Sequence, residues 1–400
     1  MRRPFLVQRI IIISRLFFTV MTDGSFRLRK PGISRPRRKL SGGRKDRRSV
    51  MRFIHIADVH LGACPDAGKA YTEQRPEEIW NTFEHIIRIC QAEQTDLLLI
   101  AGDLFHRQPL LRELKEVDYL FSTLTHTKVV LIAGNHDYIR RDSYYRTFRW
   151  HDNVYPLFGR EIRCVEFDGL QTAVYGLSYY SREITEPLYH RAAPEGRQRY
   201  EILLAHGGDE KHIPINWEEL ERSGFSYTAL GHIHKPQAVR RNRIVYAGAL
   251  EPVDRNDTGP HGYVKGELTG KGNRISWIPC ASREYIHLGV LVDERDTAGS
   301  VKQKIRKLTN EYGNENIYKI KLKGERDRDI LLDSLNPDDL GNILEVTDET
   351  RPAYDFDRLY RENADNLIGR YIESFAGCSR DSEAYQALCE GVDALLANRR

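Results

Sequence analysis

Side chains that can bind metal ions stand in five short clusters, and each cluster follows an apolar run typical of a β-strand. The clusters are Asp58-Val59-His60, Gly102-Asp103, Gly134-Asn135-His136-Asp137, His206-Gly207 and Gly231-His232-Ile233-His234. The apolar runs cover residues 53–57, 97–101, 129–133, 202–205 and 227–230. Open α/β sheets gather their ligands at the carboxyl ends of the strands, so five such clusters in one domain predict one shared site.

The residue types fit a pair of divalent cations. Two cations about 3.5–4 Å apart can clamp the attacking and leaving oxygens of an in-line displacement at phosphorus. Such a pair needs a bridging carboxylate, and imidazole and amide donors fill the other positions without adding charge. Any one cluster could equally be a hydrogen-bonded histidine or a loop cap, but the five together favour a dinuclear centre. Imidazole mixed with carboxylate suits Mn, Zn, Fe or Ni.

In this order the clusters, DxH…GD…GNHD…H…GHxH, resemble the calcineurin-like metallophosphoesterase superfamily. Longer segments are similar to SbcD-type nucleases, the phosphoesterase subunits of DNA double-strand-break repair complexes: FIHIADVHLG, DLLLIAGDLFHR, VVLIAGNHDY and LGHIHKPQ. Two others look more like the YhaO-like DNA repair exonuclease branch: LLAHGGDEKHIPI and YAGALEPVDRNDTGPHGY. The specific motifs run from Met51 to about residue 280, and the resemblance continues more loosely to the C-terminus.

The resemblance implies a metal-binding role for seven side chains. One cation would take Asp58, His60 and His234. The other would take Asn135, His206 and His232. Asp103 would bridge the two cations. Mn is the first expectation for both, with Mg, Fe, Ni and Zn as alternatives.

Two further histidines would act in catalysis without binding metal. By resemblance, His136 stabilises the transition state or protonates the leaving oxygen, a role suited to a group that titrates near neutral pH. His106 matches a position that helps orient the phosphate in archaeal and eukaryotic relatives, whereas bacterial SbcD proteins often differ there. Asp137 either orients His136 or caps the following turn, and the sequence leaves both readings open.

The charge of the chain is divided unevenly. Residues 1–50 carry fifteen Lys and Arg against two acids, a net charge of +13, so the remaining 350 residues carry a net charge of −9. An acidic body binds nucleic acid poorly by itself, so contact with DNA must come from a local basic patch, the metals or a partner. Six basic residues near the site loops are candidates for phosphate contacts, or simply part of a solvated face: Arg107, Arg140, Arg141, Lys235, Arg240 and Arg241.

Residues 1–50 form a basic extension that we expect to be disordered. We favour a non-native or over-long start, with Met51 as the functional start, because Met51 opens the first strand. A nucleic-acid-binding tail and an amphipathic membrane anchor remain as alternatives. Six scattered cysteines without a CxxC pair indicate reduced, mostly buried thiols and a cytoplasmic protein.

Strands and helices alternate at first and strands dominate later. Helices are expected at 77–91, 110–124, 300–312 and 330–335. Strands are expected at 96–101, 128–133, 162–167, 171–175, 244–247, 262–268, 285–292, 317–323 and 343–346, in addition to the runs that precede the clusters. This pattern predicts an α/β fold with two stacked sheets flanked by helices, in agreement with the four-layer αββα sandwich that the resemblance implies.

The chain divides into four parts on this basis: the extension 1–50, a metallophosphoesterase domain at 51–281, a small α/β cap domain at 283–350 and a helical C-terminal segment at 351–400. The cap either helps to admit DNA, as the resemblance implies, or serves only as a packing subdomain. Two apolar helical stripes mark the last segment, one from Ile368 to Phe375 and one from Leu388 to Leu396. They are either a local core or a docking site for the coiled coil of an SMC-like ATPase.

The sequence thus predicts a two-metal phosphodiesterase that hydrolyses DNA, as an exonuclease and in some contexts an endonuclease, beside an ATPase partner. A homodimer is also consistent with the sequence, and no membrane association is expected. Two alternatives remain: a phosphoesterase acting on a small molecule or a phosphoprotein, and a non-catalytic scaffold for the ATPase. The complete ligand set argues against the scaffold.

Overall fold

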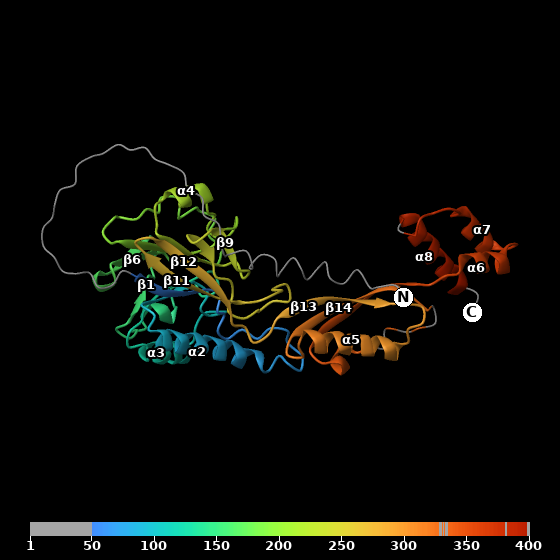
Figure 1. Ribbon diagram of the computed structural model, residues 1–400, viewed down its shortest axis with the longest axis horizontal. Coiled ribbons are helices and arrows are strands. Elements are labelled where there is room, and N and C mark those ends of the chain that lie inside the picture. Colours follow the sequence, from blue (N-terminus) through green and yellow to red (C-terminus); the bar gives the residue numbers. More distant parts are fainter. Residues whose placement is uncertain (1–49, 328–329, 331, 333–334, 381, 398–400) are drawn as a thin grey trace.

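The computed structural model describes residues 50–397, except 328–329, 331, 333–334 and 381. The basic extension at 1–50 therefore lies outside the described residues, apart from Val50, and so do three of the six residues of the helix expected at 330–335. Figure 1 shows three parts in succession along the long axis: a body of two sheets, a smaller sheet, and a group of three helices. Among the helices of the described residues, none has both the length and the apolar character needed to cross a membrane.

The first sheet has six strands in the order β12-β11-β1-β2-β3-β4. Their bounds are β1 (Val50–Ile56), β2 (Leu97–Ala101), β3 (Lys128–Ile132), β4 (Val154–Pro156), β11 (Gly262–Thr269) and β12 (Gly272–Pro279). Strands β1 to β4 are parallel, and α2 (Arg75–Glu93) and α3 (Leu111–Ser122) connect the first three. The helix expected at 77–91 corresponds to α2, and its apolar face, which includes Ile79, Phe83 and Ile86, is buried against this sheet.

The second sheet also has six strands, in the order β5-β6-β7-β8-β10-β9. Their bounds are β5 (Arg163–Phe167), β6 (Thr172–Gly176), β7 (Tyr200–His206), β8 (Tyr227–Gly231), β9 (Gln237–Arg240) and β10 (Ile244–Tyr246). The four central strands are parallel, and the edge strands β5 and β9 are antiparallel to their neighbours. Leu99 and Val130 of the first sheet share one buried core with Ile202 and Leu204 of the second, so the sheets pack face to face.

The expected αββα sandwich is confirmed, although its two outer layers differ. Helices α2 and α3 cover the first sheet. The outer face of the second sheet is covered by the six-residue helix α4 (Trp217–Arg222) and by loop residues such as Tyr179, Ile184 and Tyr189. Short 3₁₀ turns occur at η1 (Tyr144–Arg146) and η2 (Asp168–Leu170).

The third sheet consists of parallel strands β13 (Tyr285–Val292), β14 (Ile317–Arg326) and β15 (Ile343–Pro352). Helix α5 (Ala298–Tyr312) and the 3₁₀ turn η3 (Pro337–Leu340) contribute to a separate apolar core with these strands. Helices α6 (Phe356–Asn363), α7 (Leu367–Ser374) and α8 (Glu383–Ala397) follow. The two predicted apolar stripes pack against one another in the core of this helical group.

The sequence did not predict β4, β9, β12 and α4, which are short or largely exposed. β12 lies at a sheet edge and alternates between exposed and half-buried residues, so it lacks the apolar run that marked the other strands. The expectation of mostly buried cysteines is wrong: Cys90 and Cys389 are buried, whereas Cys64 and Cys164 are exposed.

One polar side chain of β1 lies at the contact between the two large sheets. His55 is fully buried, and its Nδ1 lies 3.0 Å from the hydroxyl of Tyr227 in β8. Burial lowers the pKa of His55 to about 3, because the apolar surroundings disfavour the charged ring. The folded protein therefore holds this ring neutral at pH values where the unfolded chain would protonate it.

We expect His55 to make the protein sensitive to acid. Between pH 6.5 and pH 3 His55 binds a proton in the unfolded chain but not in the folded protein. The free energy of unfolding therefore falls as pH falls through this window. Relative to the variant His55→Gln, wild type should lose about 1 kcal/mol per pH unit below pH 6, measured by urea unfolding. The exposed-site control His85→Gln should follow wild type. Parallel pH profiles for wild type and His55→Gln would contradict this account.

Candidate metal centre

The five predicted clusters all lie at the carboxyl ends of parallel strands, three in the first sheet and two in the second. Asp58 and Asp103 follow β1 and β2, Asn135 follows β3, His206 ends β7, and His232 follows β8. Because the two sheets pack face to face, these ends meet at one edge of the sandwich. Asp58, His60, Asp103 and His232 have positive φ angles, a strained backbone conformation that is often found at functional sites.

Two glycines allow the strand ends to approach this closely. A Cβ atom at Gly102 would lie 2.4 Å from Nδ1 of His206, and a Cβ at Gly134 would lie 2.2 Å from Oδ1 of Asp103. Gly102 also has a φ of +89°, which side chains rarely tolerate. The glycine in the Gly102-Asp103 cluster is therefore required by the site itself.

The first group of donors contains Asp58, His60 and His234, whose ligand atoms lie within 4.8 Å of one another. The Nε2 atoms of His60 and His234 are 3.0 Å apart. Both carboxylate oxygens of Asp58 accept the backbone N–H of His232, at 3.0 and 2.9 Å. Two imidazole nitrogens and a buried carboxylate thus face one small volume, as cation ligands would.

The second group contains Asn135, His206 and His232. Oδ1 of Asn135 lies 2.9 Å from Nε2 of His206 and 3.1 Å from Nδ1 of His232. Asp103 lies beside this group, with Oδ2 3.4 Å from Nε2 of His206. The carboxylates of Asp58 and Asp103 and the ring of His206 also fall within 4.8 Å of one another, so Asp103 connects the two groups. The structure brings all seven predicted ligands together.

The electrostatics of the site favour bound positive charge. Asp58 and Asp103 are almost completely buried, and burial raises the pKa of Asp58 to about 6. Burial would also raise the pKa of Asp103. The charge and hydrogen bond of His206 outweigh this effect and hold the pKa of Asp103 well below its usual range. Burial opposes charge on His206, yet Asp103 raises the pKa of His206 to about 9. The raised pKa of His206 favours a protonated ring beside the carboxylates, so binding of a metal to this ring would displace a proton.

The two predicted non-ligand histidines lie at the outer side of the donor groups. Nδ1 of His136 donates to the backbone oxygen of His106 at 3.0 Å, which leaves Nε2 as the basic nitrogen of the neutral ring. The backbone N–H of His136 donates to Asp103 at 2.8 Å. His106 is exposed, with its Nδ1 3.4 Å from Nδ1 of His60. His60, His106 and His136 approach closely enough to share an ion.

Asp137 was expected either to orient His136 or to cap the following turn, but in the structure it connects two loops of the site. Its carboxylate accepts the backbone N–H of Gly134 at 2.8 Å and of Phe105 at 3.3 Å. It also accepts the hydroxyl of Tyr145 at 2.9 Å. Burial raises the pKa of Asp137 to about 7. Asp137 therefore connects the loop that carries Asp103 to the loop that carries Asn135.

Sequence reasoning missed the groups that orient the three later histidines. Asp257 lies 2.8 Å from Nδ1 of His234, and Asp209 lies 2.6 Å from Nε2 of His232. Nδ1 of His206 donates to the carbonyl of Ala101 at 2.8 Å. Such partners fix the ring orientation and raise the basicity of metal-binding histidines. Both aspartates stand in segments that resemble the YhaO-like branch, Asp209 in LLAHGGDEKHIPI and Asp257 in YAGALEPVDRNDTGPHGY, but no pattern within these segments singled out either side chain.

Among the basic residues considered for phosphate contacts, Arg107, Arg140 and Arg240 form ion pairs within the protein. Arg107 pairs with Glu113 at 2.7 Å and Arg140 with Asp142 at 2.9 Å. Arg240 pairs with Glu221 at 2.6 Å. These pairs partly neutralise the positive charge around the site.

Comparison with known proteins agrees with this geometry. Residues 51–236 match the family model of calcineurin-like phosphoesterases. The DNA double-strand break repair protein Mre11 of Methanocaldococcus jannaschii is 30% identical over 222 residues, which cover 52% of this chain and 58% of that protein. The uncharacterized metallophosphoesterase YhaO of Bacillus subtilis is 28% identical over 232 residues, covering 53% and 56%. The Mre11 protein of Sulfolobus acidocaldarius is 26% identical over 303 residues, covering 68% and 75%.

The predicted superfamily resemblance is confirmed by these matches. The match spans less than two thirds of the length of the first two relatives.

Asp257 provides a test of metal binding that leaves the proposed ligands in place. In Asp257→Asn the carboxylate that holds His234 becomes a neutral amide, so we expect Mn²⁺ affinity to fall about 10- to 100-fold by calorimetric titration. The matched control is Asp254→Asn, an exposed aspartate of the same loop that should bind Mn²⁺ like wild type. Equal affinity in both variants would show that Asp257 does not support the centre.

Proposed function

We propose, on the premise that residues 51–236 form a calcineurin-like phosphoesterase domain, that this chain is a two-metal phosphodiesterase that hydrolyses DNA in repair. The convergence of seven donors from five strand ends carries the phosphodiesterase part of the proposal. The DNA part is supported by relatives named DNA double-strand break repair proteins. Exonuclease action is proposed first, with endonuclease action as an extension of the same chemistry.

Each donor has a place in the proposed centre. Asp58, His60 and His234 would hold one cation. Asn135, His206 and His232 would hold the other. Asp103 would bridge them, and the imidazole and carboxylate donors suit Mn first, with Mg, Fe, Ni or Zn as alternatives. When bound, two such cations supply the charge that polarises the phosphate and lowers the pKa of water.

The side chains around the centre would then position and protonate the substrate. Attack by water on phosphorus breaks the bond to the leaving oxygen, which must gain a proton. His136 is suited to provide it in its imidazolium form, which carries a proton on Nε2, because its ring lies beside His60 at a centroid distance of 4.8 Å and is partly exposed. The carbonyl of His106 fixes the tautomer of His136, and the exposed His106 ring lies where a phosphate could be oriented.

The third sheet is proposed to act as a cap because it is anchored on the loop that follows His60. The hydroxyl of Tyr285 in β13 donates to Asp66 at 2.5 Å, and Tyr71 donates to the same carboxylate at 3.1 Å. Arg283, just before β13, pairs with Glu78 of α2 at 2.5 Å. Movement of the cap would therefore be transmitted to the loop that leads from the ligands Asp58 and His60.

Partners are proposed to bring DNA to this centre, because the body outside residues 1–50 is acidic. Helices α6–α8 lie beyond the third sheet, away from the two-sheet body (Figure 1), and Leu367 of α7 is 66% exposed. We propose that this group binds the coiled coil of an SMC-like ATPase. Homodimerisation and a cytoplasmic location are compatible with this assignment.

His136→Ala tests the proposed catalytic role. The variant keeps all seven donors but loses the proton source for the leaving oxygen, so we expect kcat for Mn²⁺-dependent hydrolysis of linear DNA to fall about 10²- to 10⁴-fold. Mn²⁺ affinity, measured by calorimetry, should stay within about threefold of wild type, and His85→Ala should behave like wild type. A normal kcat in His136→Ala with both metals bound would remove His136 from the mechanism.

The substrate class is tested by comparing linear duplex DNA with a generic phosphodiester under the same conditions. DNA hydrolysis well above background supports the nuclease assignment. Brisk turnover of the small ester with no DNA hydrolysis would instead establish a phosphoesterase for small substrates.

A further inference from the structure

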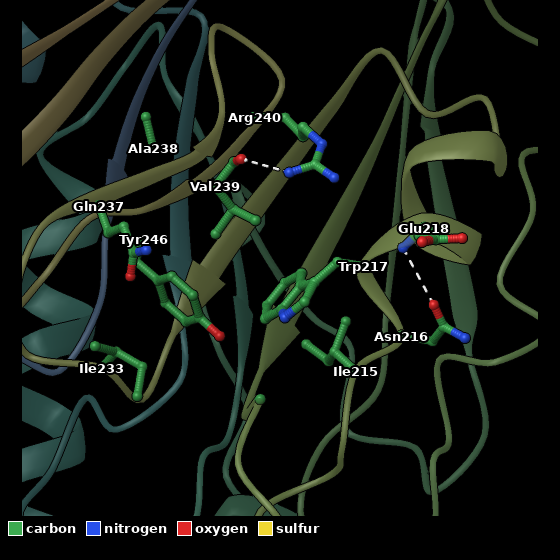
Figure 2. Close-up of a pocket in the computed structure, with 11 residues that line it drawn as sticks. Ile215, Asn216, Trp217, Glu218, Ile233, Gln237, Ala238, Val239, Arg240 and Tyr246 are labelled. Carbon is green, nitrogen blue, oxygen red and sulfur yellow. Dashed lines mark hydrogen bonds between the residues drawn. The ribbon is translucent and has the colours of Figure 1, made fainter.

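A cavity of about 980 Å³ opens between helix α4 and strands β9 and β10, of which β9 forms one edge of the second sheet. Figure 2 shows the side chains around it, including Trp217, Tyr246, Ile215 and Ile233. Its volume is within the range of pockets that hold small organic groups.

The loops of the proposed metal centre form one wall of this cavity. Gly208, two residues after the ligand His206, lines it, and Ile233 lines it from between His232 and His234. The hydroxyl of Tyr246 donates to the carbonyl of Gly207 at 2.7 Å, which fixes the aromatic wall to the same loop. A group bound in the cavity would therefore contact the loops that carry His206, His232 and His234.

The lining of the cavity suits a flat, uncharged group. The rings of Trp217 and Tyr246 lie edge to face, with centroids 6.1 Å apart, and Trp217 is only partly buried. Glu218 and Arg240 are the charged residues of the lining, and their formal charges cancel, so the cavity does not favour a phosphate. The amide of Gln237 offers both a donor and an acceptor to a polar edge.

We propose that this cavity binds an unpaired nucleobase of the DNA strand whose phosphate lies at the metal centre, with the base stacked on Trp217. The inference rests on the proposed function and specifies its substrate. Every base has a π-face, so aromatic stacking binds single-stranded DNA with little regard to sequence. A base inside a duplex cannot enter such a cavity until it leaves the stack. The enzyme would therefore prefer single-stranded or frayed ends to fully paired DNA.

Abasic substrates provide the test. Single-stranded oligonucleotides that lack one base at successive positions beside the scissile bond are compared with the intact strand by kcat/KM, with full-length protein and Mn²⁺. At one position, removal of the base should lower kcat/KM for wild type about 5- to 150-fold, the range expected for one stacked base. In Trp217→Ala this ratio should fall to about one, because the stacking surface is gone.

Two further variants act as controls. Trp217→Phe keeps an aromatic face and should retain most of the ratio. Tyr119→Ala removes an aromatic side chain that is 66% exposed on α3, which packs on the other sheet, and should match wild type. Each ratio compares two substrates with the same protein preparation, so partial unfolding of a variant does not change it.

The inference is overturned if the ratio in wild type is one at every position, or if Trp217→Ala retains the wild-type ratio. Either result leaves the nuclease assignment intact, because the DNA is still cleaved. Failure of wild type to cleave any oligonucleotide while it hydrolyses a small phosphodiester overturns the proposed function, and the inference with it.

Discussion

Burial of two carboxylates at the meeting point of two sheets is the constraint on which the site depends. Asp58 and Asp103 are almost inaccessible to solvent, and their oxygens lie close to each other and to His206. Buried charge of one sign is costly unless opposite charge accompanies it. The surrounding histidines can provide that charge as protons, or they can lose their protons to cations and become neutral ligands. The backbone must adopt special conformations to hold the carboxylates and histidines this close together. These include the positive φ angles, the close approach at Gly102 and the hydrogen bonds of Asp137.

The sequence predicted the donors because each one follows an apolar run that forms a strand. The carboxyl ends of these strands meet at one edge of the sandwich, so a pattern visible in the sequence also marked a common place in the fold. The partners of these donors depend on loop conformation, which no local pattern records. Asp257 lies 23 residues after His234 and reaches it only because its loop folds back. The exposed strand β12 and the short helix α4 were missed because tertiary contacts, and not an apolar repeat, determine them. Asp137 was noticed, but its three hydrogen-bond donors come from backbone and side chain groups that only the fold brings near.

In the proposed function, different parts of the protein and its partner would bind different parts of the DNA. The body is acidic, and Arg107, Arg140 and Arg240 are engaged in ion pairs, so the surface gives limited general attraction for DNA. The proposed metals would bind the phosphate, and the cavity lined by Trp217 and Tyr246 would bind a base. Stacking and metal coordination act over short distances, whereas capture of long DNA needs extended positive charge. In the proposed function the ATPase partner would supply that capture, and the third sheet would transmit its movement through Asp66 to the loop that follows His60.

The claim at the centre of this account is that two cations share Asp103. Anomalous diffraction from crystals of the full chain grown with Mn²⁺ tests it most directly, because the anomalous signal locates each ion independently of the protein atoms. The account predicts two peaks about 3.5–4 Å apart, with Asp103 between them, His60 and His234 at one ion, and His206 and Asn135 at the other. A single peak, or two peaks that do not share Asp103, would contradict it.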